Sequence, residues 1–294
     1  MLDIPTHAVL ASDDLEVVLL PDIGARIHRL RAWGVDLLRT PQDPGTHAAD
    51  PWFWGAYVMA PWCNRITPGP TEVLGRMVDV PANFPDGSAI HGQVSHRPWE
   101  VIGDGAFRVE GGGEGTGWPW RYEVTASLAV AGPTLSLRYA LRNLDDGPMP
   151  AGLGLHPWFR APLDLRVPAA SVYAVNSDSQ ARPVAVAGPL DLSTSTTPAP
   201  GLDATWVDLD EPVLGLAWPE LGLAARIEVT APSPDHLAVP VATPAGMHAT
   251  AVEPQTHGPD GLRRLLRREP HALAALERGR SLELALTVAV RRTG

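Results

Sequence analysis

Residues 152–159 read Gly-Leu-Gly-Leu-His-Pro-Trp-Phe. The run is apolar apart from one imidazole, His156, and a proline follows that histidine. Because proline disfavours the helical conformation for the residue before it, His156 is predicted to lie in an extended segment. A lone histidine in an apolar strand is by default a core side chain. Imidazole also exchanges protons near neutral pH, so His156 is a candidate acid–base group as well, although the core interpretation is the simpler one for this residue alone.

Residues 249–261 place a second titratable group in a similar setting. Glu253 ends an apolar run and, like His156, directly precedes a proline. We expect both side chains to project from extended backbone with restricted ψ. If the two segments are converging strands, His156 and Glu253 form an acid–base pair.

The rest of the chain is predicted to be all-β. Short runs of alternating or β-branched residues, separated by turn residues, recur throughout, and 31 prolines and 28 glycines among 294 residues disfavour long helices. The predicted strands are 15–20, 26–33, 72–80, 121–130, 135–143, 224–230, 236–242 and 281–290. One helix is expected at about 259–268, and its continuation after Pro270 is left open. With no internal repeat and no linker-like segment, residues 1–294 are predicted to form one β-sandwich domain.

Composition excludes several kinds of function. The net charge is −10, and all 23 basic residues are arginine, so a Schiff-base lysine and a Walker-type phosphate loop are ruled out. The single Cys63 excludes an internal disulfide and a cysteine-rich metal site. The only dense basic run, within residues 263–268, is interpreted as a solvated helix face, and no nucleic-acid partner is expected. No signal peptide or transmembrane run is apparent, so we expect a cytoplasmic protein without a membrane partner.

Polar residues suited to binding hydroxyl groups occur at three further places. Asn64 and Arg65 together offer a fork of donors plus an amide, and a structural ion pair or turn contact is the alternative interpretation. His91 precedes Gly92 at an expected strand end, where a glycine lets a ligand come close. Asp203 stands where a loop enters a strand, although turn capping is the simpler interpretation of that residue alone. The histidines have no recognised metal-ligand spacing, so no metal site is predicted. Ten tryptophans modestly favour sugar stacking.

Taken in order, these segments resemble the aldose 1-epimerase (galactose mutarotase) family over nearly the whole chain. The motifs are Pro-Trp-Cys-Asn-Arg-Ile at 61–66, Ile-His-Gly at 90–92, Leu-His-Pro-Trp-Phe at 155–159, Asp203, and Glu-Pro-Gln-Thr at 253–256 with Pro-Asp at 259–260. Each motif alone is weak, and the five in this order are fairly specific. The resemblance implies a large antiparallel β-sandwich of the galactose mutarotase type.

The resemblance also implies an activity and roles for named residues. Glu253 would be the general base at the anomeric hydroxyl of an aldose, and His156 the general acid at the ring oxygen. The residues expected to hold sugar hydroxyls are Asn64, Arg65, His91 and Asp203. No metal or organic cofactor is implied, and the expected partner is a small sugar bound to a monomer or homodimer.

Three departures from the family pattern leave the identity of the sugar substrate undetermined. Ala238 stands where the family often has a glutamine, Trp62 replaces a phenylalanine, and Gln93 replaces a second glycine after His91. Loss of the glutamine puts galactose specificity in doubt. A mutarotase for hexose 6-phosphates or unusual sugars, and a non-catalytic sugar-binding module, remain alternatives. A glycosidase is disfavoured because those enzymes normally use two carboxylates.

Overall fold

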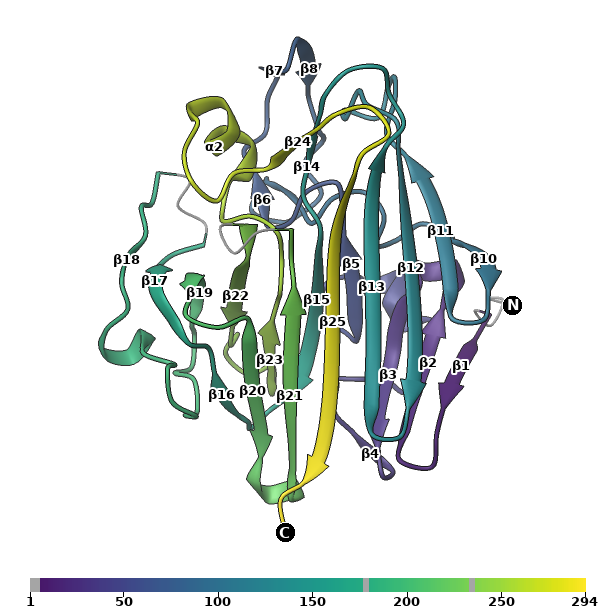
Figure 1. Ribbon diagram of the computed structural model, residues 1–294, viewed down its shortest axis with the longest axis vertical. Coiled ribbons are helices and arrows are strands. Elements are labelled where there is room, and N and C mark those ends of the chain that lie inside the picture. Colours follow the sequence, from purple (N-terminus) through teal and green to yellow (C-terminus); the bar gives the residue numbers. More distant parts are fainter. Residues whose placement is uncertain (1–5, 177–179, 233–235) are drawn as a thin grey trace.

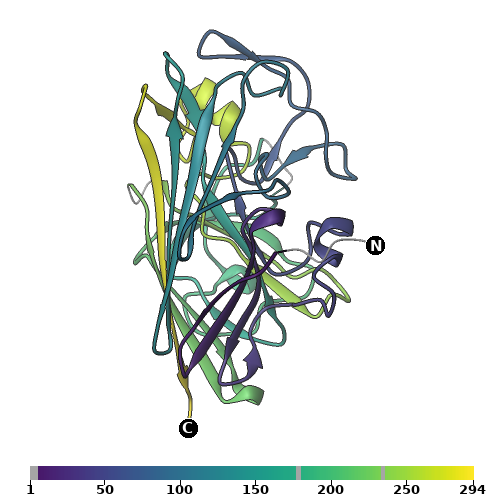
Figure 2. The same cartoon turned by 90° about the vertical axis from the view of Figure 1, so that its right-hand side faces the viewer.

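The structure is a computed structural model that describes residues 6–176, 180–232 and 236–294. Two large antiparallel sheets face each other, as the front and side views show (Figures 1 and 2). The predicted all-β sandwich is therefore confirmed. Among the described residues, no helix has the length and apolar character of a membrane span.

The larger sheet has eleven strands in the order β1-β2-β3-β5-β15-β23-β22-β19-β17-β18, with β4 paired to β3. Their bounds are β1 Ala8–Ala11, β2 Leu15–Leu20, β3 Arg26–Ala32, β4 Val35–Asp36, β5 Ala56–Met59, β15 Gly154–Arg160, β17 Ala169–Tyr173, β18 Val184–Ala185, β19 Asp203–Leu209, β22 Ala238–Ala242 and β23 Ala249–Val252. The two segments expected to converge, β15 and β23, are direct neighbours in this sheet.

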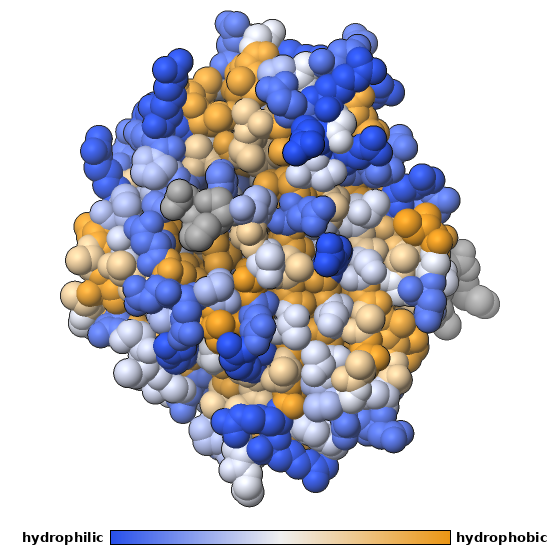
Figure 3. Space-filling view, in the orientation of Figure 1, coloured by the Kyte–Doolittle hydropathy of each residue, from blue (hydrophilic) through white to orange (hydrophobic). Residues whose placement is uncertain are grey.

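The smaller sheet has eight strands in the order β10-β11-β12-β13-β25-β21-β20-β16. Their bounds are β10 Glu100–Gly103, β11 Ala106–Gly111, β12 Tyr122–Ala131, β13 Thr134–Asn143, β16 Asp164–Arg166, β20 Val213–Trp218, β21 Leu223–Thr230 and β25 Ser281–Arg292. Along β13, Leu135, Leu137 and Leu141 are buried whereas Ser136 and Arg138 are exposed. This alternation is expected for an antiparallel sheet with one face in solvent. Figure 3 accordingly shows hydrophilic residues interspersed with hydrophobic ones on this side of the molecule.

Three two-stranded sheets and a few short helices complete the described part of the chain. The pairs are β6 Arg65–Ile66 with β9 Ala89–Ile90, β7 Thr71–Val73 with β8 Arg76–Val78, and β14 Met149–Ala151 with β24 Ala274–Leu276. The helices are α1 Thr46–Ala49, α2 Gly261–Arg267, and the 3-10 turns η1 Pro21–Ile23, η2 Gly188–Leu190 and η3 Pro219–Leu221.

Three sequence interpretations are corrected by the structure. Residues 72–80 form a hairpin, because Leu74 and Gly75 both adopt positive φ and make a two-residue turn between β7 and β8. The helix at 259–268 exists as α2 but does not continue after Pro270, where β24 follows. The arginine run is not wholly solvated: Arg264 is buried, stacks on Tyr173 and bonds to Glu269.

The core lies between the two large sheets and sets the direction of the catalytic candidates. In β15, Leu155 and Phe159 belong to this core. Since successive strand residues point to opposite faces, His156 and Trp158 point away from it, onto the outer face of the eleven-stranded sheet. Figure 2 shows purple and blue segments from the first hundred residues on that outer side. Residues of these segments, among them Trp52, Asn64 and His91, line a cavity together with His156 of the sheet.

Candidate active site

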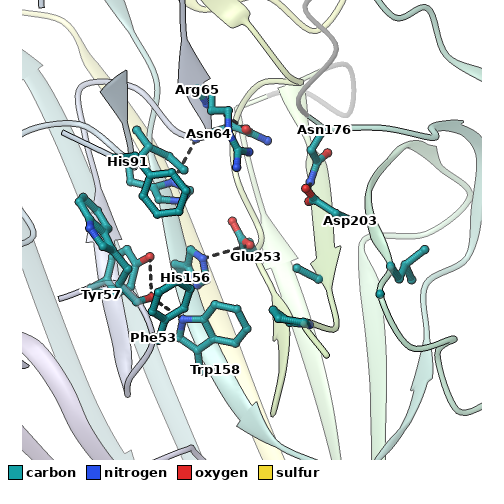
Figure 4. Close-up of a pocket in the computed structure, with 17 residues that line it drawn as sticks. Phe53, Tyr57, Asn64, Arg65, His91, His156, Trp158, Asn176, Asp203 and Glu253 are labelled. Carbon is teal, nitrogen blue, oxygen red and sulfur yellow. Dashed lines mark hydrogen bonds and ion pairs between the residues drawn. The ribbon is translucent and has the colours of Figure 1, made fainter. Parts of the chain in front are cut away.

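The centre of the site is the pair His156 and Glu253. His156 lies in β15 between β5 and β23, and Glu253 directly follows β23. The backbone N–H of Glu253 donates to the carbonyl of Pro240. The His156 Nε2 and Glu253 Oε1 atoms lie 3.2 Å apart, and both residues are about 95 % buried, with 4 % and 5 % exposed. The pair is thus within proton-transfer distance in a largely dry environment (Figure 4).

Aromatic rings fix the plane of the His156 imidazole. Tyr57, its register partner in β5, stacks on it with 4.6 Å between ring centroids and 26° between planes. Trp158 contacts it with 5.0 Å between centroids. The Trp158 indole N–H donates to the carbonyl of Trp52, and the Tyr57 hydroxyl donates to the same carbonyl. The imidazole is therefore held by rings that are themselves hydrogen-bonded.

Burial disfavours charge on both members of the pair. Burial lowers the pKa of His156 to about 3, and the nearby charge of Arg26 acts in the same direction. Burial raises the pKa of Glu253 well above its usual value, and the charge of Asp203 adds to this while Arg65 opposes it. Burial therefore favours the uncharged form of each member, and in these forms the pair has no net charge.

Asn64 and His91 are brought to the site by the small β6–β9 sheet. The Asn64 backbone N–H donates to His91 Nδ1 at 3.2 Å, and the His91 backbone N–H donates to the Asn64 carbonyl at 3.1 Å. Both residues adopt the left-handed conformation, with φ of 53° and 58°. Since Nδ1 of His91 accepts a hydrogen bond, the neutral ring carries its proton on Nε2, which is then a donor. Burial lowers the pKa of His91 well below its usual value and keeps the ring neutral.

Steric crowding explains why the residue after His91 is a glycine. Gly92 has φ of +75°, and a Cβ atom on it would lie 2.0 Å from the carbonyl oxygen of Ala60. The close approach of these two segments requires glycine at this position. The segment carrying Asn64 is also tied to the segment carrying Glu253, because the Cys63 N–H donates to His257 Nε2 at 2.9 Å.

Arg65 and Asp203 both line the cavity, and each is held by a neighbouring polar side chain. Arg65 Nε donates to Asp86 at 2.8 Å. Asp203 begins β19, and its Oδ1 accepts from Asn176 Nδ2 at 2.6 Å. The Thr205 hydroxyl in turn donates to Asn176 Oδ1. Asp203 is thereby oriented by a chain of two polar side chains.

The structure brings all six sequence-predicted site residues into one cavity of about 280 Å³ (Figure 4). Sequence reasoning missed its apolar and aromatic wall and the amide beside Asp203; these residues are Trp52, Phe53, Tyr57, Phe84, Trp158 and Asn176. Trp158 could have been found from the sequence, since it lies two residues after His156 and must share its face of the strand. Nothing in the local sequence around Asn176 indicates that it lines the cavity. Ala238 is fully buried outside this wall and pairs with Gln255.

A metal ion is a possible occupant, because one ligand atom each from His91, His156 and Glu253 lie within 4.8 Å of one another. Two histidines and a carboxylate are a set that transition metals accept. However, His91 Nδ1 is already engaged by the Asn64 N–H, and its Nε2 then carries the ring proton. The described donors therefore fit a neutral polar ligand better than a cation.

A family model described as aldose 1-epimerase matches residues 7–210, more than two thirds of the chain. This chain belongs to the aldose 1-epimerase family. The matched range contains Asn64, Arg65, His91, His156 and Asp203. A comparison with curated protein sequences gives no match.

Solved structures extend the likeness of fold beyond residue 210. A GalM/aldose epimerase homologue from C. elegans is 16% identical with a TM-score of 0.82, covering 99% of this chain and 100% of that one. A galactose mutarotase-like protein from Clostridium acetobutylicum is 16% identical with a TM-score of 0.81, covering 97% and 94%. A galactose 1-epimerase from Lactobacillus acidophilus NCFM is 16% identical with a TM-score of 0.73, again covering 97% and 94%. The aldose 1-epimerase fold thus includes the strand that leads to Glu253.

Proposed function

We propose that this protein interconverts the α and β anomers of a free aldose by acid–base catalysed ring opening and closure. The observation that carries the proposal is the buried pair with 3.2 Å between His156 Nε2 and Glu253 Oε1. An anomeric carbon bears both the ring oxygen and the anomeric hydroxyl. An acid and a base that serve two oxygens on one carbon must themselves lie close together, as this pair does.

In the proposed reaction Glu253 removes the proton of the anomeric hydroxyl while His156 gives a proton to the ring oxygen. The bond between the anomeric carbon and the ring oxygen breaks, and the former hydroxyl oxygen becomes a carbonyl. Rotation about the C1–C2 bond exposes the other carbonyl face. Closure reverses both proton transfers, and the pair ends in its starting state.

The ionisation of the pair is compatible with these roles. The reactive form needs Glu253 ionised and His156 protonated, whereas burial favours both uncharged forms. Both forms hold one proton in total. They differ only by the transfer of that proton from Oε1 to Nε2, so no exchange with solvent is needed to pass between them. A sugar whose hydroxyls solvate the carboxylate would favour the reactive form.

We propose that Asn64, Arg65, His91 and Asp203 hold sugar hydroxyls. Together they offer hydrogen-bond donors, including the His91 Nε2–H, and the carboxylate acceptor of Asp203. The Trp158 ring lies beside His156 and offers an apolar surface to a sugar ring. No cofactor takes part in the proposed reaction.

The decisive experiment follows the optical rotation, or the NMR anomeric signals, of freshly dissolved α-glucose, α-galactose, α-xylose and α-arabinose with and without protein. We expect equilibration of at least one sugar to accelerate in proportion to protein concentration, and Glu253→Gln to remove the acceleration. A non-catalytic sugar-binding module would bind sugar without accelerating equilibration.

A preference for hexose 6-phosphates has less support from the cavity. Arg65 is the only arginine among the described residues that line it, and it is already paired with Asp86. Asp203 and Glu253 contribute carboxyl groups to the same lining. A dianionic phosphate would be poorly compensated there. Including glucose 6-phosphate in the same assay tests this alternative directly.

Two broader expectations are also part of the proposal. We propose that residues 1–294 fold as one domain, and that the protein is a cytoplasmic monomer or homodimer. A single cooperative unfolding transition and a sedimentation measurement of mass would test the first expectation and the oligomeric state.

A further inference from the structure

A second cavity, of about 330 Å³, adjoins the proposed sugar site. Arg65 and Asn176 line both cavities, so the two meet at these side chains. Figure 4 shows Arg65 and Asn176 on the same side of the first cavity, at its edge farthest from Trp158. A molecule that fills the first cavity would reach the second by extending between Arg65 and Asn176.

The second cavity is lined by polar groups, and one of them has an unused hydrogen-bonding atom. Thr67, Asp86, Ser88 and Asp260 contribute hydroxyl and carboxyl groups to its wall. Asp260 is only 4 % exposed, and its Oδ1 has no hydrogen-bond partner among the described residues. Its Oδ2 makes a long contact of 3.4 Å with the Thr67 hydroxyl and one of 3.5 Å with Arg263 Nε. A buried carboxyl oxygen without a partner is costly unless a ligand or water supplies a donor.

The charges of the wall select the kind of ligand. Two carboxyl groups, Asp86 and Asp260, face one lining arginine, Arg65, whose Nε is already bonded to Asp86 at 2.8 Å. Asp260 in turn has Arg263 beside it, so each arginine near this wall already faces a carboxyl group and neither is left to compensate a phosphate or carboxylate. Hydroxyl groups, in contrast, can donate to the carboxyl oxygens and accept from Arg65 and Asn176.

We propose that the second cavity is a subsite for a second neutral sugar unit, and that the preferred substrate is a reducing disaccharide or longer saccharide. The proposal rests on the proposed mutarotase function. The reducing-end ring would lie in the first cavity with its anomeric carbon at His156 and Glu253. The next unit, attached through a hydroxyl remote from the anomeric carbon, would extend past Arg65 and Asn176 toward Asp260.

The first test compares wild-type kcat/KM for monosaccharides and disaccharides. The panel is glucose and galactose against maltose, cellobiose, lactose and melibiose, which differ in linkage, with mutarotation followed by polarimetry or NMR. One or two additional hydrogen bonds at the second cavity predict at least one disaccharide with a kcat/KM about tenfold above that of its own reducing-end monosaccharide. Equal values across the whole panel would overturn the subsite.

Two variants localise the effect. Thr67→Trp fills the second cavity, so the ratio of disaccharide to monosaccharide kcat/KM should fall to about one. Asp260→Asn removes a carboxyl acceptor with little change of shape, and the ratio should fall several-fold. Thr71→Trp is the matched control, since it makes the same change four residues away, outside the wall of either cavity, and should leave the ratio unaltered. Thermal unfolding of each variant checks that it folds, and the wild-type ratio remains a test if one does not.

The outcomes separate the two proposals. If no sugar is turned over, the mutarotase function fails and the subsite fails with it. If monosaccharides are turned over but no disaccharide is preferred, or if Thr67→Trp leaves a preference unchanged, the subsite fails while the mutarotase function stands. A preference for glucose 6-phosphate over every disaccharide would also overturn the subsite.

Discussion

Replacing Glu253 with glutamine tests the acid–base pair most directly. The change removes the proton acceptor and keeps the size and hydrogen-bonding shape of a buried side chain. A general base typically contributes on the order of 10²–10⁴ in rate. That factor corresponds to about 3–5 kcal/mol of transition-state free energy. We expect a loss of this size for Glu253→Gln, and a similar loss for His156→Asn, which removes the general acid.

The distance between the two groups determines how the losses combine. Two independent groups would multiply their effects, so a double variant would lose roughly 10⁴–10⁸ in rate. His156 Nε2 and Glu253 Oε1 lie 3.2 Å apart, and both are proposed to move protons in the same step, so they should act as a unit. We therefore expect the double variant to lose little more than either single variant.

The assay is protein-dependent mutarotation of the most responsive aldose, after subtraction of the spontaneous rate. Sugar affinity measured by calorimetry should change little in Glu253→Gln, because the amide still fills the site. Glu220→Gln, in the 3-10 turn η3 outside the cavity wall, is the matched control and should keep full activity. If Glu253→Gln folds normally and keeps most of its activity, the base is another residue. A double variant that loses the product of the two single losses would instead show that the groups do not act together.

Three further predictions follow from the same geometry. Burial raises the pKa of Glu253 above its ordinary value of about 4.5, so the unfolded chain ionises this group at lower pH than the folded protein does. Between the unfolded-state and the folded-state pKa, the free energy of unfolding therefore falls as pH rises, by up to about 1.4 kcal/mol per pH unit. Glu253→Gln should therefore unfold at a higher temperature than wild type at pH 8 and at nearly the same temperature at pH 4, and an equal difference at both pH values would contradict this. Asn176→Ala removes the 2.6 Å bond to Asp203 and should raise KM up to about tenfold with a smaller change in kcat, whereas an unchanged KM would show that Asp203 needs no support. Treatment with a chelator should leave mutarotation intact, and activity lost with EDTA and restored by a divalent ion would refute the metal-free reaction.

Local rules predicted the strands that carry the catalytic candidates. The prolines after His156 and Glu253 restrict the backbone before them, and the apolar residues on either side belong to β15 and β23. The turn within residues 72–80 was missed because Leu74 is a poor residue for positive φ, so only Gly75 pointed to a hairpin. The sequence pattern there suits one strand as well as two.

Contacts between distant segments could not be predicted in the same way. Asn176 lies 27 positions from Asp203, and nothing in either local sequence indicates that the amide supports the carboxylate. Arg264 belongs to a run of arginines that looks solvated, yet it is buried against Tyr173, which is far away in the sequence. The resemblance to the family supplied Asn64, Arg65, His91 and Asp203 as one set, where spacing alone offered no reason to join them.

The conformation of His91 shows how the fold prepares the site before any sugar binds. Its left-handed backbone costs free energy for a residue with a Cβ, on the order of 1 kcal/mol or more. Two bonds offset this cost: the His91 N–H donates to the Asn64 carbonyl, and the Asn64 N–H donates to His91 Nδ1. The second bond also selects the tautomer with a proton on Nε2. The same pair of residues thus stabilises the left-handed backbone of His91 and fixes which nitrogen of its ring is the donor. Because Gly92 permits the close approach to Ala60 that holds this segment on the sheet, the donor on His91 is fixed relative to His156, with 5.0 Å between the two ring centroids. A sugar entering the cavity would therefore meet a preoriented donor, which lowers the ordering cost of binding and leaves the His156–Glu253 pair free to move protons.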